Sequence, residues 1–246
     1  MRALCLTLAA TIALTACSSK TPAAPPALKP GGSACEGLVQ PGGKQVRFGE
    51  NDGLAGVVIG DGKAAVVLAH QAPGSLCEWL PYARSLAERG YRALAFDFNG
   101  AGSSSFTGHL GDQDVADAVT YLRGQGVTQV FLMGASRGGT AVVTAGARIA
   151  PPVDGVISLS APAAFAGMNA REAAPALAVP VLYICAEFDT SFVDAAKELY
   201  DLSKGSKDRR LKITYGSQHG VAMLMPGVDN EPGLEITGFL KTYAKG

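Results

Sequence analysis

Two patterns of hydrophobic and polar residues alternate along the chain from about residue 45 to residue 243. The first pattern is a short, almost continuous apolar run, which is typical of strands in a parallel sheet covered on both faces. We expect such strands at residues 65–69, 92–96, 129–133, 155–159, 181–185 and 211–215. Two more short strands, 45–48 and 54–59, flank an Asn-Asp-Gly turn and predict a hairpin.

The second pattern spaces apolar residues three and four positions apart, as amphipathic helices do. We expect helices at residues 78–89, 112–123, 136–149, 170–177, 192–202 and 231–243, with Asp112 as a cap. Strands that alternate with helices over about 200 residues predict a doubly wound α/β domain, with a mostly parallel central sheet and helices on both faces. The sequence shows no internal repeat and no second domain.

Composition narrows the classes of function without choosing one. The 246 residues are 48% hydrophobic, and 21 basic side chains balance 21 acidic ones. Zero formal charge without a basic stripe gives no case for nucleic-acid binding. Three dispersed histidines do not make a metal site, and a phosphate loop of the G-x-x-x-x-G-K-[ST] type is missing from the sequence. We therefore expect no cofactor and no metal.

The first residues resemble a targeting segment. Arg2 precedes an apolar run, 3–16, that is shorter than the ~20 residues needed to span a bilayer and suits a signal peptide. The run ends Leu14-Thr15-Ala16-Cys17, which resembles the lipobox of bacterial lipoproteins. The resemblance implies cleavage before Cys17, a lipid on Cys17, and an exported protein held on the extracytoplasmic side of a bacterial membrane by that lipid alone. The alternatives are an ordinary secretory peptide or a buried N-terminal helix.

The prolines predict an extended tether after the signal peptide, and the cysteines predict a disulfide in an exported chain. Four prolines in residues 18–34 favour an extended tether. The expected organisation is thus a signal peptide (1–16), a lipidated Cys and tether (17–34) and one α/β domain (35–246). In an oxidising compartment we expect Cys35 and Cys77, both near turns, to form a disulfide. Cys185, inside an apolar run, is expected to be a buried, inert thiol. Three free thiols are the alternative.

The pentapeptide Gly134-Ala-Ser136-Arg-Gly138 lies between the apolar run 129–133 and a helix of small residues. It matches G-x-S-x-G, in which a serine occupies a strained turn and its small neighbours let strand and helix approach. The turn also places Ser136 at a helix N-terminus, which favours negative charge. A glycine-rich turn without function is the alternative interpretation.

A serine nucleophile needs a base and an acid that orients the base. Of His70, His109 and His219, only the last lies in a loop after a late strand, so His219 is the expected base. Asp189 follows the run 181–185 and opens the next helix, which makes it the expected acid. Glu187 and Asp194 remain as alternatives.

The order Ser136, Asp189, His219, each after a strand, resembles the α/β-hydrolase family. Residues 66–75, with His70 and Gln71, are similar to its oxyanion loop, and residues 93–103 are similar to its D-x-R-G-x-G-x-S segment. The resemblance implies an oxyanion hole built from the backbone N–H groups of Gln71 and Arg137. The sequence departs from the family at two positions: Gln71 stands where Gly is common, and Asn99 stands where Arg is common.

The roles expected for the remaining candidates are structural. We expect His70 and Asp97 to support the fold and His109 to lie on a surface loop.

The resemblance implies a serine hydrolase, carboxylesterase-like, that cleaves a small-molecule ester, thioester or related acyl bond through an acyl-enzyme. Family members commonly carry a cap after the sixth strand, but residues 160–180 are too few for one besides the crossover. We therefore expect no cap domain, an open cleft and a preference for short acyl chains. Amide cleavage or acyl transfer by the same residues, and a non-catalytic binding lipoprotein on the same fold, are the alternatives.

Overall fold

Eight strands form the central sheet of this computed structural model, which describes residues 35, 42–225 and 230–245. Their order is β1-β2-β4-β3-β5-β6-β9-β10, and every neighbouring pair is parallel except β1–β2 and β2–β4. This order confirms the predicted mostly parallel sheet. The strands are β1 (Gly43–Phe48), β2 (Leu54–Ile59), β3 (Ala64–Ala69), β4 (Arg92–Asp97), β5 (Gln129–Ala135), β6 (Gly155–Leu159), β9 (Val181–Ala186) and β10 (Arg209–Thr214).

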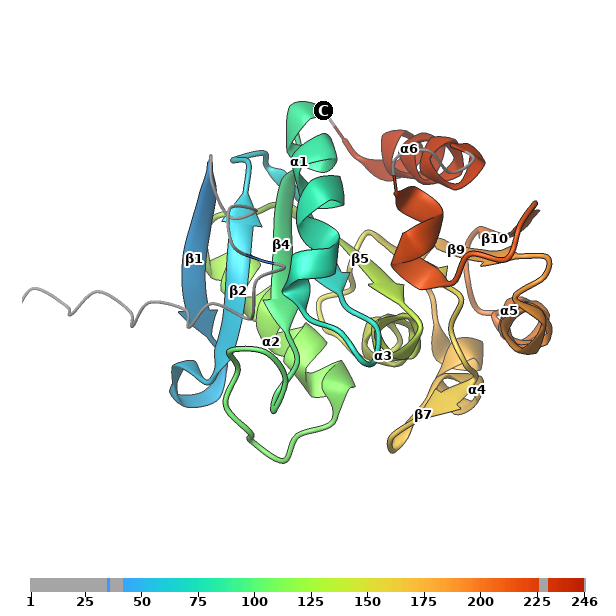
Figure 1. The fold of residues 1–246 in the computed structure, drawn as a ribbon, viewed down its shortest axis with the longest axis horizontal. Helices are drawn as coiled ribbons and strands as arrows, with labels where there is room; N and C mark the ends of the chain where they lie inside the picture. Colours follow the sequence, from blue (N-terminus) through green and yellow to red (C-terminus); the bar gives the residue numbers. More distant parts are fainter. Residues whose placement is uncertain (1–34, 36–41, 226–229, 246) are drawn as a thin grey trace, which may run out of the picture.

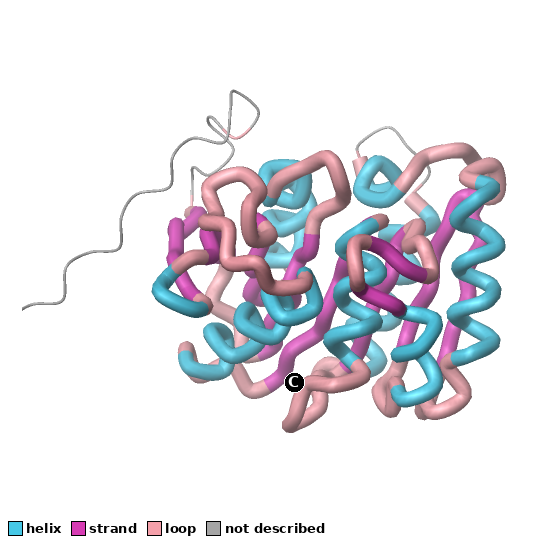
Figure 2. The backbone as a smooth tube through the Cα atoms, turned by 90° about the horizontal axis from the view of Figure 1, so that it is seen from below, coloured by secondary structure: helices cyan, strands magenta, loops and turns pink. Residues whose placement is uncertain are grey.

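Helices bury both faces of the sheet, which explains why its strands are almost continuously apolar. Along β3, Ala65 and Val67 pack on one face, while Val66 and Leu68 pack on the other. The first face is covered by α2, α3 and α5, and the second by α1 and α6 (Figure 1). Figure 2 shows the strands running between the helical layers. These helices are α1 (Leu80–Glu88), α2 (Gly111–Gly124), α3 (Arg137–Gly146), α5 (Thr190–Leu202) and α6 (Glu231–Tyr243).

The predicted helices are present, with differences at their ends. Asp112 does not cap α2, because the cap position is Leu110. Asp112 lies in the first turn and pairs with Arg148 at 2.8 Å. A carboxylate is favourable at a cap and in the first turn alike, so the sequence signal did not separate the two positions.

The connection from β6 to β9 contains a small hairpin that the sequence analysis missed. It consists of β7 (Ala164–Phe165) and β8 (Met168–Asn169), followed by α4 (Ala170–Ala173) and the 3₁₀ turn η3 (Ala174–Ala176). The predicted helix at 170–177 is therefore two short pieces. Two-residue strands leave no detectable alternation in the sequence. The connection forms no separate cap domain, as expected.

A disulfide joins Cys35 to Cys77, the predicted pair, with their Cα atoms 5.1 Å apart. It ties residue 35 to the 3₁₀ turn η2 (Leu76–Trp79), which precedes α1. Cys185 is a buried free thiol, also as predicted. Burial, reinforced by the nearby Asp189 carboxylate, raises the pKa of its thiol to about 12, so the thiol stays protonated.

The predicted signal peptide, the lipidated Cys17 and the tether lie outside the described residues. Within the part of the chain that the structure describes, no helix is long and apolar enough to cross a membrane.

Candidate active site

Ser136 occupies a sharp turn between β5 and α3. Its backbone has φ 50° and ψ −116°, a conformation that costs free energy for a residue other than glycine. The flanking glycines are sterically required. A Cβ at Gly134 would lie 2.2 Å from the Gly138 carbonyl oxygen, and a Cβ at Gly138 would lie 2.1 Å from the Ala69 carbonyl oxygen. The G-x-S-x-G spacing thus lets β5, α3 and β3 meet at the serine.

The turn gives Ser136 the environment of a helix N-terminus. Arg137 is the first residue of α3, so its N–H has no acceptor within the helix and lies beside the serine. The N–H of Ser136 donates to the Leu159 carbonyl at 2.8 Å, which ties the turn to the end of β6. Negative charge that develops next to Ser136 is therefore favoured by the fold.

The structure brings together His219 and Asp189, predicted from separate loops. His219 Nδ1 lies 2.8 Å from Asp189 Oδ2. Asp189 occupies the cap position of α5 but makes no cap hydrogen bond with its side chain, so this carboxylate faces the imidazole instead. Glu187 and Asp194, the alternatives, are exposed.

The loop that carries His219 packs against the serine turn. The Gly220 N–H donates to Ser160 Oγ at 3.1 Å, and a Cβ at Gly220 would lie 3.1 Å from Ala135 Cβ. Ser160, at the end of β6, has φ 47° and is completely buried. No hydrogen bond joins the Ser136 hydroxyl to His219 among the described contacts, and such bonds are often long without substrate.

Sequence reasoning missed Ser160 because it belongs to no motif. Its unusual backbone conformation and its bond to Gly220 exist only once β6 lies beside β5 and the His219 loop folds over both.

The loop after β3 differs from the predicted oxyanion loop in one respect. The Gln71 N–H, expected to be open to substrate, donates to Glu78 Oε1 at 2.8 Å. This hydrogen bond has a local cause, because residues 71–78 fold back and bring the Glu78 carboxylate of η2 to the backbone of Gln71. The Gln71 side chain accepts from the Val221 N–H at 3.2 Å and so links this loop to the His219 loop.

Glu78 was not singled out by the sequence, where it reads as a residue at the start of a helix. Burial raises the pKa of its carboxyl group to about 7, against the opposing effects of the Gln71 N–H and the Arg137 charge.

His70 lies beneath this loop and is completely buried. Its Nδ1 lies 2.8 Å from the Gln71 carbonyl oxygen, and its Nε2 accepts from the Phe98 N–H at 3.2 Å. Burial and the Arg137 charge lower the pKa of His70 to about 3, so the ring is neutral. The Arg137 guanidinium lies over the Phe98 ring, 4.3 Å from its centroid. Both ring nitrogens of His70 contact backbone groups, which fits the expected structural role.

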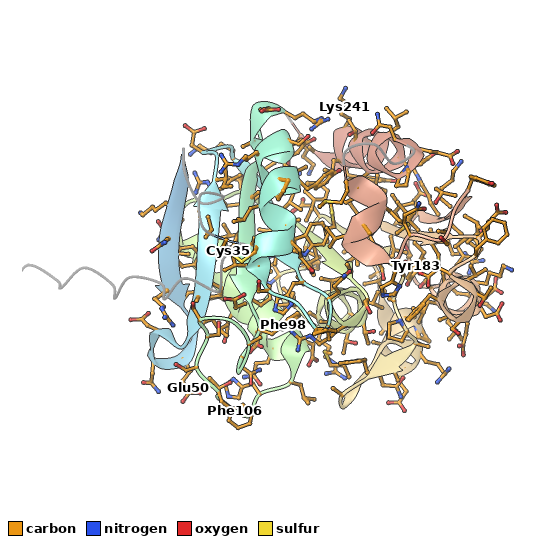
Figure 3. The ribbon with its side chains drawn as sticks, in the orientation of Figure 1. Cys35, Glu50, Phe98, Phe106, Tyr183 and Lys241 are labelled. Carbon is orange, nitrogen blue, oxygen red and sulfur yellow. A yellow bond between two sulfur atoms is a disulfide. The ribbon has the colours of Figure 1, made fainter. Side chains whose placement is uncertain are left out.

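The remaining candidates also have structural contacts. Asp97 accepts from the backbone N–H groups of Leu76 at 2.8 Å and Ser103 at 2.9 Å, and thereby holds two loops together. His109 lies 3.3 Å from Glu50. Figure 3 shows Glu50 and Phe106 at one edge of the molecule, whereas Phe98 lies near its middle.

Asn99, which stands where the family commonly has Arg, donates to Asp114 Oδ2 at 2.7 Å. Among the described residues, no group of three or more His, Cys, Asp or Glu side chains could hold a metal ion.

A cavity of about 450 Å³ lies between the β6–β9 connection and α5. One wall is Pro162, whose carbonyl accepts from the Thr140 hydroxyl in the first turn of α3, and another is Ser191, two residues after Asp189. Charged side chains also line it: Arg171, Asp194 and Glu198. Ala163, Ala164 and Ala195 complete the lining, so the cavity presents both charged and apolar side chains.

Comparison with known proteins identifies the fold. A family model described as the alpha/beta hydrolase fold matches residues 64–178. An esterase of Pyrococcus furiosus superposes with a TM-score of 0.73 at 18% identity, covering 85% of this chain and 94% of that chain. A dienelactone hydrolase of Anabaena variabilis superposes with a TM-score of 0.69 at 19% identity, covering 84% and 100%.

An acylaminoacyl peptidase of Pyrococcus horikoshii has a TM-score of 0.68 at 16% identity, covering 82% of this chain but only 41% of that chain. A search of curated protein sequences finds no match. The chain has the α/β-hydrolase fold.

Proposed function

We propose that the protein is a serine hydrolase that cleaves a small ester, thioester or related acyl bond through an acyl-enzyme. The observation that carries this proposal is the strained turn of Ser136 (φ 50°, ψ −116°) at the N-terminus of α3, where Gly134 and Gly138 let β5, α3 and β3 meet. The Asp189–His219 pair beside that turn supplies what a serine nucleophile needs. The esterase and the peptidase with the same fold are in keeping with acyl chemistry.

In the proposed reaction the Ser136 hydroxyl oxygen attacks the acyl carbon and its proton passes to His219 Nε2. Asp189 keeps the other proton on Nδ1 and stabilises the imidazolium that forms. The carbonyl oxygen becomes an oxyanion beside the Arg137 N–H at the start of α3. The leaving group departs with the proton from His219. Water, deprotonated by the same imidazole, then attacks the acyl carbon, the bond to Ser136 Oγ breaks, and His219 returns the proton to that oxygen.

The short connection between β6 and β9, which forms no separate cap, favours a small acyl group over a long alkyl chain. Without a cap, the fold supplies no tunnel wall in which each methylene of a long chain could be buried. Peptide cleavage or acyl transfer by the same residues, and ligand binding without catalysis, remain as alternatives.

We also propose that the protein is exported and lipid-anchored through Cys17. The support is the apolar run that ends in the Leu14-Thr15-Ala16-Cys17 sequence. The Cys35–Cys77 disulfide is in keeping with an oxidising compartment.

Labelling with a fluorophosphonate probe tests the enzymatic proposal without knowledge of the substrate. We expect the wild-type protein to be labelled on Ser136 and Ser136→Ala to be unlabelled, because the probe reacts only with an activated serine. Ser191→Ala, an exposed serine beside the same cavity, is the matched control and should label normally. Equal labelling of Ser136→Ala and wild type would refute Ser136 as the nucleophile.

A further inference from the structure

The Glu78 carboxylate accepts a hydrogen bond from the Gln71 N–H, a donor that the proposed reaction needs free for its oxyanion. An oxyanion hole takes preorganised donors aimed at the developing charge, and loss of one donor lowers kcat by about 10²–10³. The Arg137 N–H is one such donor, and Gln71 supplies the other in the sequence prediction. The Gln71 N–H instead donates to Glu78 Oε1 at 2.8 Å. The state of this one carboxyl group therefore decides whether the hole has both donors.

The fold reserves space for the Glu78 side chain in this position. A Cβ at Gly74 would lie 2.9 Å from Glu78 Oε2 and 2.8 Å from the Gln71 carbonyl oxygen, so a larger residue at 74 would displace the carboxylate or the loop. The preceding residue, Cys77, is held by the disulfide to Cys35. The contact between Glu78 and Gln71 is thus part of a constrained loop.

The Arg137 charge in α3 acts on the Glu78 carboxyl group. Other ionisable groups lie near η2 or interact with Arg137: His70 after β3, Asp97 in β4, Tyr82 in α1 and Asp114 in α2. Burial places the pKa of His70 at about 3 and that of Tyr82 at about 12, so both stay neutral near pH 7. Burial also raises the pKa values of Asp97 and Asp114 and lowers that of Arg137. The pKa of Glu78 is raised to about 7, so its charge changes near neutrality.

We propose, on the premise of the serine hydrolase above, that Glu78 is a positioning residue that controls the oxyanion hole. As a carboxylate it holds the Gln71 N–H, and as a neutral acid it yields that N–H to the substrate oxygen. The physical reason is that a hydrogen bond to a charged acceptor is roughly twice as strong as one to a neutral acceptor. The N–H therefore prefers an ionised Glu78 to an uncharged ester carbonyl, and prefers the oxyanion to a neutral Glu78. An ionised Glu78 also repels the oxyanion.

The test compares Glu78→Gln with wild type in the rate of fluorophosphonate labelling at pH 6.5 and pH 8.5, corrected for decay of the probe. Between these pH values the neutral fraction of a group with a pKa of about 7 falls by roughly 25-fold. We expect the wild-type rate to fall by about this factor. The neutral amide of Glu78→Gln cannot ionise, so the labelling rate of this variant should not fall between the two pH values.

Glu88→Gln, an exposed carboxylate at the end of α1, is the matched control and should follow wild type. The ratio of rates at two pH values, taken on one sample, cancels any difference in folded fraction between variants. An alkaline fall that persists in Glu78→Gln, or a wild-type rate that does not fall, overturns this inference while leaving the serine hydrolase intact. Wild-type protein that does not label at either pH refutes the proposed hydrolase itself.

Discussion

Replacing Asp189 with Asn removes the charge beside His219 while keeping the size of the side chain. The carboxylate oxygen lies 2.8 Å from His219 Nδ1, and the Asp189 side chain is 11% exposed. With charge centres about 4 Å apart and an effective dielectric constant of about 20, the carboxylate stabilises the imidazolium by ~4 kcal/mol. At ~1.4 kcal/mol per factor of ten, the loss of this charge slows acylation by about 10³.

The amide has a second effect, on the tautomer of the imidazole. An Asn that donates to Nδ1 leaves the ring proton on Nε2, which then cannot take the proton of Ser136. The two effects together predict a decrease in kcat of about 10⁴ for Asp189→Asn.

The assay is hydrolysis of p-nitrophenyl acetate, with thermal unfolding measured on the same samples. Because the Asp189 side chain does not cap α5, Asp189→Asn should unfold within a few degrees of wild type. Glu187→Gln, an exposed carboxylate two residues earlier, is the control and should retain full activity. Near-normal activity in Asp189→Asn together with a large loss in Glu187→Gln would show that the wrong carboxylate has been assigned.

Three further predictions concern stability, processing and substrate. Cys77→Ser opens a loop with a sequence separation of 42 and should lower the free energy of unfolding by ~4 kcal/mol in the chain-entropy model, measured by denaturant titration; an unchanged midpoint would contradict it. Mass spectrometry of protein from its native membrane should show an N-terminus at Cys17 carrying acyl chains, and an intact Met1 terminus would refute the lipoprotein proposal. In a panel of p-nitrophenyl esters, kcat/KM should not keep rising beyond about eight acyl carbons; a continued gain of ~0.8 kcal/mol per methylene would reveal an apolar tunnel.

Much of the fold could be predicted because its determinants are local in the sequence. A strand buried on both faces must be apolar throughout, so β3, β5 and β9 are visible as runs without any knowledge of their neighbours. The two-residue strands β7 and β8 are too short to show a period, and they escaped detection for that reason.

The position of Ser136 was also determined by sequence alone, because the turn needs glycines at fixed spacing on either side of the serine. Gly134 and Gly138 are required by contacts of their own backbone with neighbouring backbone, and only residues without a side chain satisfy them. The candidate base and acid followed from their positions after strands, although the sequence left Glu187 and Asp194 open beside Asp189.

The tertiary structure alone decided which polar groups meet at the edge of the sheet. It brings Asp189, rather than Glu187 or Asp194, into contact with His219. It also makes Ser160 Oγ the acceptor of the Gly220 N–H and Glu78 the acceptor of the Gln71 N–H. Each of these contacts joins residues from different loops, at distances and angles that depend on strand order and on how each loop folds back. Hydrophobic periodicity encodes the elements and their buried faces, but it carries no information about which hydrogen bonds form between their ends.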